Sequence, residues 1–76
     1  MATEATLTIE GLAIRLRPHI RVGQRRLTYF DVMHGGSWID CGEPMHGAIS
    51  GKQGKAALAH YARVAIRRHD EAAALA

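Results

Sequence analysis

Arginine or histidine occupies every second position from Arg15 to Arg21 within residues 12–22, whose sequence is L-A-I-R-L-R-P-H-I-R-V. The cationic or titratable positions are Arg15, Arg17, His19 and Arg21, and the residues between them are apolar or proline. Alternation with a period of two is typical of a β-strand with one buried and one solvated face. Guanidinium groups bind phosphate and carboxylate oxygens as planar, bidentate donors. The stretch therefore predicts a strand that presents a continuous, outward-facing arginine line on one face of a sheet.

The spacing of this arginine line suits a row of anionic groups. Alternate residues on a strand lie about 6.6–6.8 Å apart, close to the distance between phosphates along a nucleic-acid strand. Arg25 and Arg26 at the following turn extend the basic patch. Proteins that bind single strands interleave aromatic residues for base stacking, whereas this patch has only the ring of His19. We therefore expect double-stranded nucleic acid or an acidic protein surface as the partner.

A structural interpretation of the arginine line stays open. A sheet edge rich in arginine and containing a proline is protected against pairing with a neighbouring chain. Pro18 lies in the middle of the stretch and lacks the backbone donor that a central strand needs. The arginines could thus serve only to keep a sheet edge from pairing with a neighbouring sheet and have no binding role.

A second basic element lies where a helix is expected to start, in the sequence S-G-K-Q-G-K-A-A of residues 50–57. Lys52 and Lys55 fall in its first turns, where free backbone amides favour anions. Arg63 and Arg67 lie on the outer arc of the same helix and complete the candidate partner-binding residues. A solvated helix start without any binding role is the alternative.

The predicted strands and helix over residues 26–66, with these lysines, resemble the C-terminal part of a double-stranded RNA-binding domain. In that family, lysines at the start of the last helix grip phosphates across a groove. The resemblance implies such a role for Lys52 and Lys55. The chain departs from the family pattern because it lacks the adjacent lysine pair, has Gly54 in the first turns and has no N-terminal helix.

Cysteine and histidine side chains are the remaining candidates for chemistry. A zinc site needs four ligands in recognisable pairs, and the spacing of His34, Cys41 and His46 provides no such pair. A cysteine nucleophile would need activation by a nearby histidine and an oxyanion site. We expect Cys41 to be a quiet core thiol, with no metal, no cofactor and no enzymatic activity. A small Cys/His enzyme or metal protein is the lesser alternative.

The net charge of +3 is unevenly distributed along the chain. Residues 11–30 contain five arginines and no acidic residue, whereas residues 31–50 contain three acidic residues and no lysine or arginine. Eight of the ten cationic residues are arginine, so most of the positive charge can pair in a bidentate way. The clustering favours an acidic partner.

Cysteine usage and the chain start indicate the compartment. A single cysteine excludes an intrachain disulfide and fits a reducing cytosol. The first ten residues carry two acids and no basic segment, so we expect no signal peptide. The longest apolar runs are far shorter than the roughly 18–20 residues of a membrane span. We expect a cytoplasmic protein without a membrane partner.

Alternation and turn signals predict an α+β fold. An antiparallel β-meander of three to four strands is expected over about residues 6–41, followed by a loop over 42–50 and one C-terminal α-helix over about 51–72, packed on a face of the sheet. The strand that carries the arginine line lies at a sheet edge or breaks at Pro18 into two pieces. The chain of 76 residues forms one domain, 1–76, whose small core leaves both a monomer and a homodimer open.

The helix has a predicted start and a predicted buried face. Ser50 and Gln53 have the form of a capping box, which places the first helical residue at 51 or 52. Trp38 is expected to anchor the core. At 100° per residue, the inner arc of the helix contains Leu58, Tyr61, Ala62, Ala65, Ile66 and Ala72.

These observations predict a non-catalytic binding or inhibitor module. Its basic, arginine-rich sheet face would dock onto a nucleoprotein complex or an acidic protein surface. In size and layout the chain resembles the small inhibitors that phages and mobile elements encode, of the anti-CRISPR type, which implies inhibition of a host defence complex by occupation of a surface. The alternative is a protein that binds nucleic acid directly and without sequence specificity.

Overall fold

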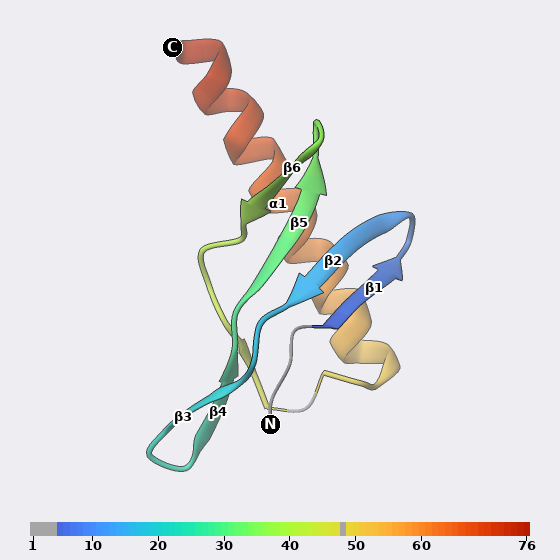
Figure 1. Ribbon diagram of the computed structural model, residues 1–76, viewed down its shortest axis with the longest axis vertical. Coiled ribbons are helices and arrows are strands. Elements are labelled where there is room, and N and C mark those ends of the chain that lie inside the picture. The colour runs from blue at the N-terminus through green and yellow to red at the C-terminus, as the bar shows by residue number, and fades with distance from the viewer. Residues whose placement is uncertain (1–4, 48) are drawn as a thin grey trace.

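Strands with alternating burial, joined by short turns, precede one long helix in the computed structural model, which describes residues 5–47 and 49–76. The strands pair antiparallel in two sheets (Figure 1). The predicted α+β fold class, with a C-terminal helix against a sheet face, is confirmed. In chain order the elements are β1 (Ala5–Ile9), β2 (Leu12–Leu16), β3 (Ile20–Val22), β4 (Arg25–Thr28), β5 (Phe30–His34), β6 (Ser37–Asp40), β7 (Met45–His46) and α1 (Lys52–Leu75).

The larger sheet has the strand order β1-β2-β5-β6, and the smaller sheet has the order β3-β4-β7. Because β2 leads into β3 and β4 leads into β5, the smaller sheet is the far end of one long, bent hairpin (Figure 1). The meander predicted over residues 6–41 is therefore present but divided between two sheets. The two-residue strand β7 lies inside the predicted loop and adds a third strand to the smaller sheet.

The turn between β5 and β6 is a two-residue hairpin turn formed by Gly35 and Gly36. Gly35 and Gly36 adopt φ angles of +60° and +81°. A two-residue hairpin of this type needs positive φ at both central positions, which a residue without a Cβ adopts most easily. The turn fixes the pairing of His34 with Ser37 and hence the register of the two strands.

The helix covers the face of the larger sheet that carries the apolar half of the alternation (Figure 1). Ile14, Val32 and Leu58 are 0% exposed. Ala59 and Ala62 are also 0% exposed, and their small side chains let the helix lie close to the sheet. The buried core cluster consists of Ile9, Ile14, Phe30, Val32, Met45, Leu58, Ala59 and Ala62.

The predicted inner arc of the helix is correct near its centre and wrong at two positions. Ala62 and Ala65 are buried, and Ile66 packs against the core. Tyr61 lies at the margin of the arc and is 43% exposed. Ala72 is exposed because the last turns of the helix extend beyond the sheet (Figure 1).

The helix begins at Lys52, but the predicted capping box does not form. The N-cap residue is Gly51, in an extended conformation, and no side chain of the described residues caps the N-terminus of the helix. The N–H of Lys55 donates to the carbonyl of Gly51 at 3.0 Å, so Ser50 precedes the cap position by one residue. At the other end the helix reaches Leu75, three residues past the predicted end.

Candidate functional site

The strand that carries the arginine line breaks at Pro18, which is one of the two outcomes predicted for it. In the larger sheet Leu16 pairs with Phe30, and in the smaller sheet Ile20 pairs with Leu27. Between these two pairs, the segment from Leu16 to Ile20 contains three residues, whereas the opposite segment from Leu27 to Phe30 contains only two. The extra residue is a bulge, which accommodates a proline that cannot donate a ladder hydrogen bond.

The bulge moves the second half of the arginine line to the other face. Residues paired across antiparallel strands share a face, so Arg15 lies with Asp31 and Arg21 lies with Arg26. Positions 26 and 31 lie on the segment that returns from the turn and differ by five, an odd number. Burial alternates along this segment on either side of Tyr29, so the side chains at positions 26 and 31 lie on opposite faces. Arg21 and Arg26 therefore lie on the helix side of the ribbon, whereas Arg15 lies on the opposite, open face.

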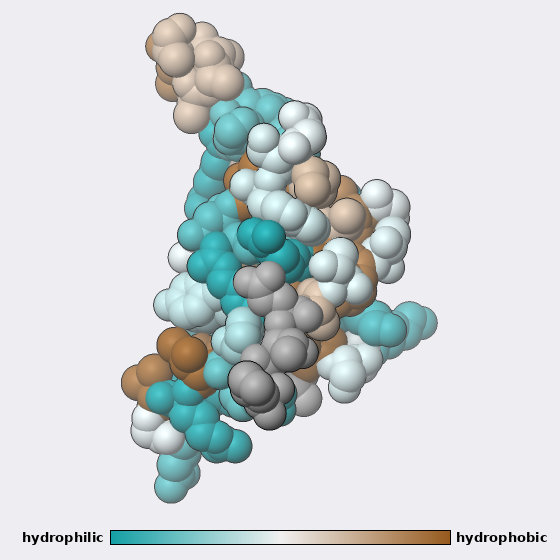
Figure 2. Space-filling model, viewed as in Figure 1, coloured by the Kyte–Doolittle hydropathy of each residue, from teal (hydrophilic) through white to brown (hydrophobic). Residues whose placement is uncertain are grey.

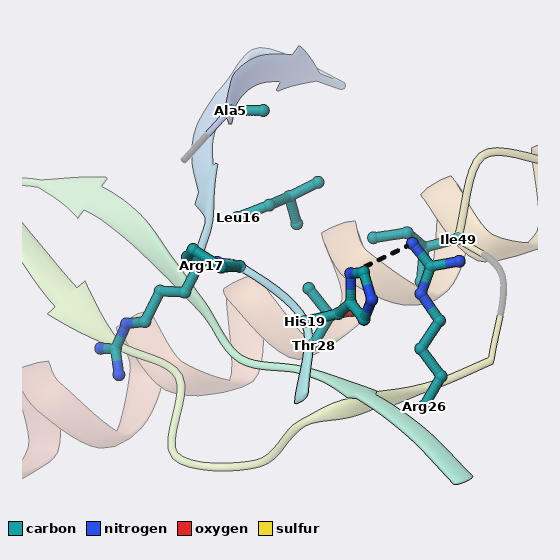
Figure 3. Close-up of a pocket in the computed structure, with 8 residues that line it drawn as sticks. Ala5, Leu16, Arg17, His19, Arg26, Thr28 and Ile49 are labelled. Carbon is teal, nitrogen blue, oxygen red and sulfur yellow. Dashed lines mark hydrogen bonds between the residues drawn. The ribbon is translucent and has the colours of Figure 1, made fainter. Parts of the chain in front are cut away.

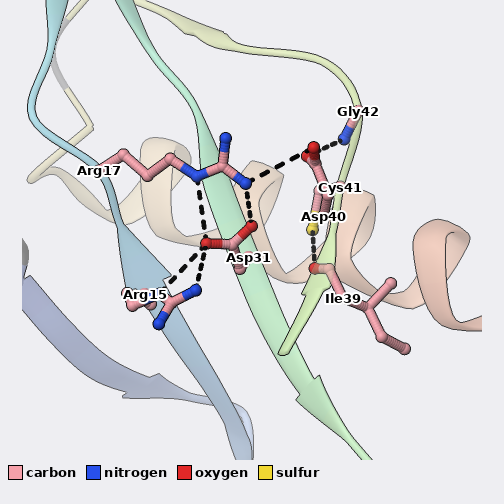
Figure 4. A network of polar contacts seen from close by, with 7 residues as sticks. All are labelled: Arg15, Arg17, Asp31, Ile39, Asp40, Cys41 and Gly42. Carbon is pink, nitrogen blue, oxygen red and sulfur yellow. Dashed lines mark hydrogen bonds and ion pairs between the residues drawn. The ribbon is translucent and has the colours of Figure 1, made fainter. Parts of the chain in front are cut away.

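On the open face, Asp31 binds both arginines that precede the bulge (Figure 4). Its carboxylate accepts from Nε and Nη2 of Arg15 at 3.2 and 3.0 Å. It also accepts from Nε of Arg17 at 3.2 Å and from Nη2 of the same side chain. Asp31 is 2% exposed, although it stands on the sheet face opposite the helix. Two guanidinium groups thus bury one carboxylate.

The electrostatics of this cluster favour the charged forms. Burial alone would raise the pKa of Asp31, but the hydrogen bonds and charges of Arg17 and Arg15 outweigh it and hold this pKa below its ordinary value. The hydrogen bond to Asp31 likewise raises the pKa of Arg17. Asp40 adds a further ion pair to Arg17 at 3.5 Å. The positive charge of both arginines is therefore balanced within the fold.

Trp38 belongs to the same cluster and not to the core, where the sequence places it. The guanidinium carbon of Arg15 lies 4.6 Å from the centre of the Trp38 ring, a cation–π geometry. Trp38 is partly exposed and is absent from the core cluster of the described residues. The ring packs beside the cation and restricts its orientation.

The predicted continuous, outward-facing and unpaired arginine line is wrong for two physical reasons. The bulge at Pro18 divides its members between two faces. Asp31, 16 and 14 residues further along the chain, pairs with both Arg15 and Arg17, and Asp40 supplies the second negative charge. These two arginines have a demonstrated intramolecular partner, so they are left out of the binding surface proposed below.

Three candidate arginines lie on the projecting hairpin of β3, its turn and β4, residues 20–28, which we call the arm (Figure 1). Arg21, Arg25 and Arg26 are all exposed. Among residues 5–47 and 49–76, no carboxylate forms an ion pair with any of them. The arm therefore carries three positive charges without a negative one.

Two of these charges face each other across the arm. The turn of two residues pairs Val22 with Arg25, and the next pair is Arg21 with Arg26. In a hairpin of this type the pair next to the closing one lacks mutual hydrogen bonds, which brings its Cα atoms to about 4.5 Å. Like charges directly opposite destabilise a hairpin. The guanidinium groups of Arg21 and Arg26 therefore repel each other, and a bound anion would reduce this repulsion.

The arm also exposes apolar side chains. Ile20 is 48% exposed and Val22 is 57% exposed. The register places them with Leu27 and Arg25 on the face opposite Arg21. Figure 2 shows hydrophobic and hydrophilic surface side by side at the end of the molecule that the arm forms. The arm therefore has a cationic face with Arg21 and Arg26 and an opposite face on which apolar side chains are exposed.

The helix carries the other candidate cations. Lys52, Lys55 and Arg67 are exposed, and no ion pair among the described residues includes them. Arg63 donates to Oε1 of Glu10 at 3.0 Å, which ties the helix to the β1–β2 turn. The structure does not bring these residues together with the arginine line into one continuous patch.

Cys41 lines one pocket with His60 and Arg68, whereas His34 contacts other residues of the helix. Burial, followed by the charges of Asp31 and Asp40, raises the pKa of the Cys41 thiol to about 11. His34 forms an ion-pair contact of 2.9 Å with Asp70 on the helix and an edge contact with His69. Within the described part of the chain, no group of three His, Cys, Asp or Glu side chains is arranged to hold a metal ion. The charge of Arg17 lowers this pKa, but burial and the two carboxylates outweigh it, so the thiol stays protonated and unactivated near pH 7.

Comparison of the chain with protein-family models, with curated proteins and with solved structures finds no match. No helix within residues 5–47 and 49–76 has both the length and the apolar character needed to cross a membrane.

Proposed function

We propose that this chain is a non-catalytic binding module that docks its arm onto the acidic surface of a protein or nucleoprotein complex. The observation that carries the proposal is the unbalanced charge of the arm, with Arg21 opposite Arg26, Arg25 beside them and no carboxylate partner in the described residues. An acidic partner supplies the missing anions and removes the repulsion between the opposed guanidinium groups.

The apolar face of the arm favours a protein surface. Arginine together with exposed aliphatic side chains is a composition found at protein interfaces. Ile20 and Val22 gain stabilisation only where a partner removes them from water. By covering such a surface, the module would act as an inhibitor of the anti-CRISPR type that its size and layout resemble.

Direct binding of double-stranded nucleic acid is the second candidate. A two-stranded β-ribbon fits the major groove of a duplex, and the opposed Arg21 and Arg26 could contact its phosphates. Such a complex depends strongly on salt, because each phosphate contact releases counterions.

Affinity capture from a lysate of the source cells, with and without nuclease, tests the proposal. The arm variant replaces Arg21, Arg25 and Arg26 by glutamine. The control variant makes the same charge change on the helix, at Lys52, Lys55 and Arg67. We expect the arm variant to lose the partner while its melting temperature stays within a few degrees of the unmodified chain, and the control to keep the partner.

Three results would change the interpretation. Equal losses in both variants would show that net charge, and not the arm, attracts the partner. Full retention by the arm variant would refute the proposed surface. Loss of the complex on nuclease treatment, with affinity that falls steeply between roughly 50 and 200 mM salt, would favour the nucleic-acid candidate.

A further inference from the structure

An open pocket of about 330 Å³ lies at the root of the arm, where the two sheets meet the loop before the helix (Figure 3). Residues from β1, β2, the bulge, β4 and the loop contribute to it. The residues that line it are Ala5, Leu16, Arg17, Pro18, His19, Arg26, Thr28 and Ile49. The pocket lies on the helix side of the ribbon, the face to which the bulge assigns Arg26.

The floor of the pocket is aliphatic. Leu16 and Ile49 pack against the core cluster with part of their surface, and Pro18 adds a ring without a donor. Thr28 is 5% exposed and is the hydroxyl-bearing residue among the lining residues. A small apolar group therefore finds a complementary surface here, whereas a nucleobase finds no phenyl or indole ring on which to stack.

The rim of the pocket is cationic. Nη2 of Arg26 lies 3.5 Å from Nδ1 of His19 (Figure 3). A guanidinium group only donates, so Nδ1 accepts in this contact and the ring proton resides on Nε2. Arg26 and His19 thus keep further donors for an anion. The guanidinium of Arg17 points away from them, toward the carboxylate that already balances it.

We infer that this pocket binds a carboxylate carried on a small apolar body. The carboxylate accepts hydrogen bonds from Arg26 and His19, and the apolar part lies on Leu16, Pro18 and Ile49. The opposed Arg21 strengthens the local positive potential. The inference rests on the proposed function, since a protein partner would present this group as an acidic residue beside an apolar one.

Titration of the ¹⁵N-labelled full chain with 3-phenylpropionate, followed by amide chemical shifts, tests the inference. We expect saturable shifts at Leu16, His19, Arg26 and Ile49. The neutral isostere 3-phenylpropan-1-ol should bind at least tenfold more weakly because it lacks the charge. Acetate should also bind at least tenfold more weakly, because it lacks the apolar body.

An arginine outside the pocket provides the matched control. Arg26→Gln should weaken binding of 3-phenylpropionate at least tenfold. Arg67→Gln removes the same charge from an exposed position on the helix that does not line the pocket, and should change the affinity less than twofold. Equal effects of the two variants, or equal binding of the alcohol, would overturn the inference. Tighter binding of adenosine monophosphate than of 3-phenylpropionate would overturn the choice of a carboxylate.

The two proposals fail in distinguishable ways. If 3-phenylpropionate does not bind while the arm variant loses its partner, the inference about the pocket is wrong and the arm remains the proposed binding surface. If 3-phenylpropionate binds as expected while the arm variant keeps its partner, the proposed function is wrong and the pocket stands.

Discussion

Replacing Asp31 by asparagine tests the claim that one buried carboxylate organises the open face of the sheet. Asparagine keeps the size and one acceptor oxygen but removes the charge that Arg15 and Arg17 share. Hydrogen bonds to charged groups contribute about 1.5–3 kcal/mol each. The arginine side chains are 30% and 39% exposed, so water replaces part of what they lose.

We therefore expect Asp31→Asn to lower the free energy of unfolding at pH 7 by about 2–3 kcal/mol, less than the loss for a fully buried pair. A chain of 76 residues has a total stability of roughly 4–11 kcal/mol. The variant should thus unfold at a clearly lower urea concentration. The folded population should remain large enough to measure.

The pH dependence gives this prediction a second, independent readout. The folded-state pKa of Asp31 lies below its unfolded value. Its contribution to stability is therefore fully present above the unfolded pKa of about 3.9 and is lost as the pH falls toward the folded pKa. The difference in stability between the unmodified chain and Asp31→Asn should be largest at pH 5–7 and shrink below about pH 4.

Urea unfolding followed by far-ultraviolet circular dichroism at pH 7, 5 and 3 measures both effects. Asp40→Asn is the matched control, because Asp40 is 59% exposed and pairs with Arg17 at 3.5 Å. An exposed pair of this kind contributes about 0–1 kcal/mol. A variant at Asp31 that is as stable as the control, or a difference that does not change between pH 7 and pH 3, would refute the reasoning.

Two further predictions concern single residues elsewhere in the fold. Gly54→Ala should destabilise the chain by about 1–2 kcal/mol, because overpacking costs more than the helix propensity gained, and an added Cβ would lie 2.8 Å from the backbone of Ile49. A stabilised Gly54→Ala in thermal unfolding would contradict the clash. Cys41 should react with a thiol-specific disulfide reagent at pH 7 about tenfold more slowly than a cysteine of ordinary pKa. Only the thiolate reacts, and a pKa raised from 9.0 to about 11 lowers the thiolate fraction about a hundredfold, which the greater nucleophilicity of a more basic thiolate offsets by about tenfold. Reaction at the rate of a free cysteine would show that the thiol is accessible and activated.

The elements of the fold could be predicted because their signals are local. Alternation over residues 12–22 predicted the strand that forms β2 and β3, and turn signals predicted an antiparallel meander before one helix. The inner arc of the helix was correct around Ala62 because periodicity is a property of neighbouring residues. The strand β7 was missed, since two residues that pair across a loop carry no periodic signal.

The binding surface could be predicted only in part. Residues 11–30 appear as five uncompensated arginines in the sequence, and the acidic residues that follow appear as a separate negative segment. Asp31 is the first of these acidic residues. Nothing within a few residues of it indicated that two arginines would bury it.

By itself the sequence determined that arginines alternate with apolar residues, that strands precede a helix and that positive charge is concentrated in one part of the chain. Only the tertiary structure decided which arginines are free. The pairing of Arg15 and Arg17 with Asp31 depends on the register between β2 and β5, and the separation of Arg21 depends on the bulge at Pro18. Register and bulge arise from hydrogen bonds between segments distant in the chain, and a local pattern does not contain that information.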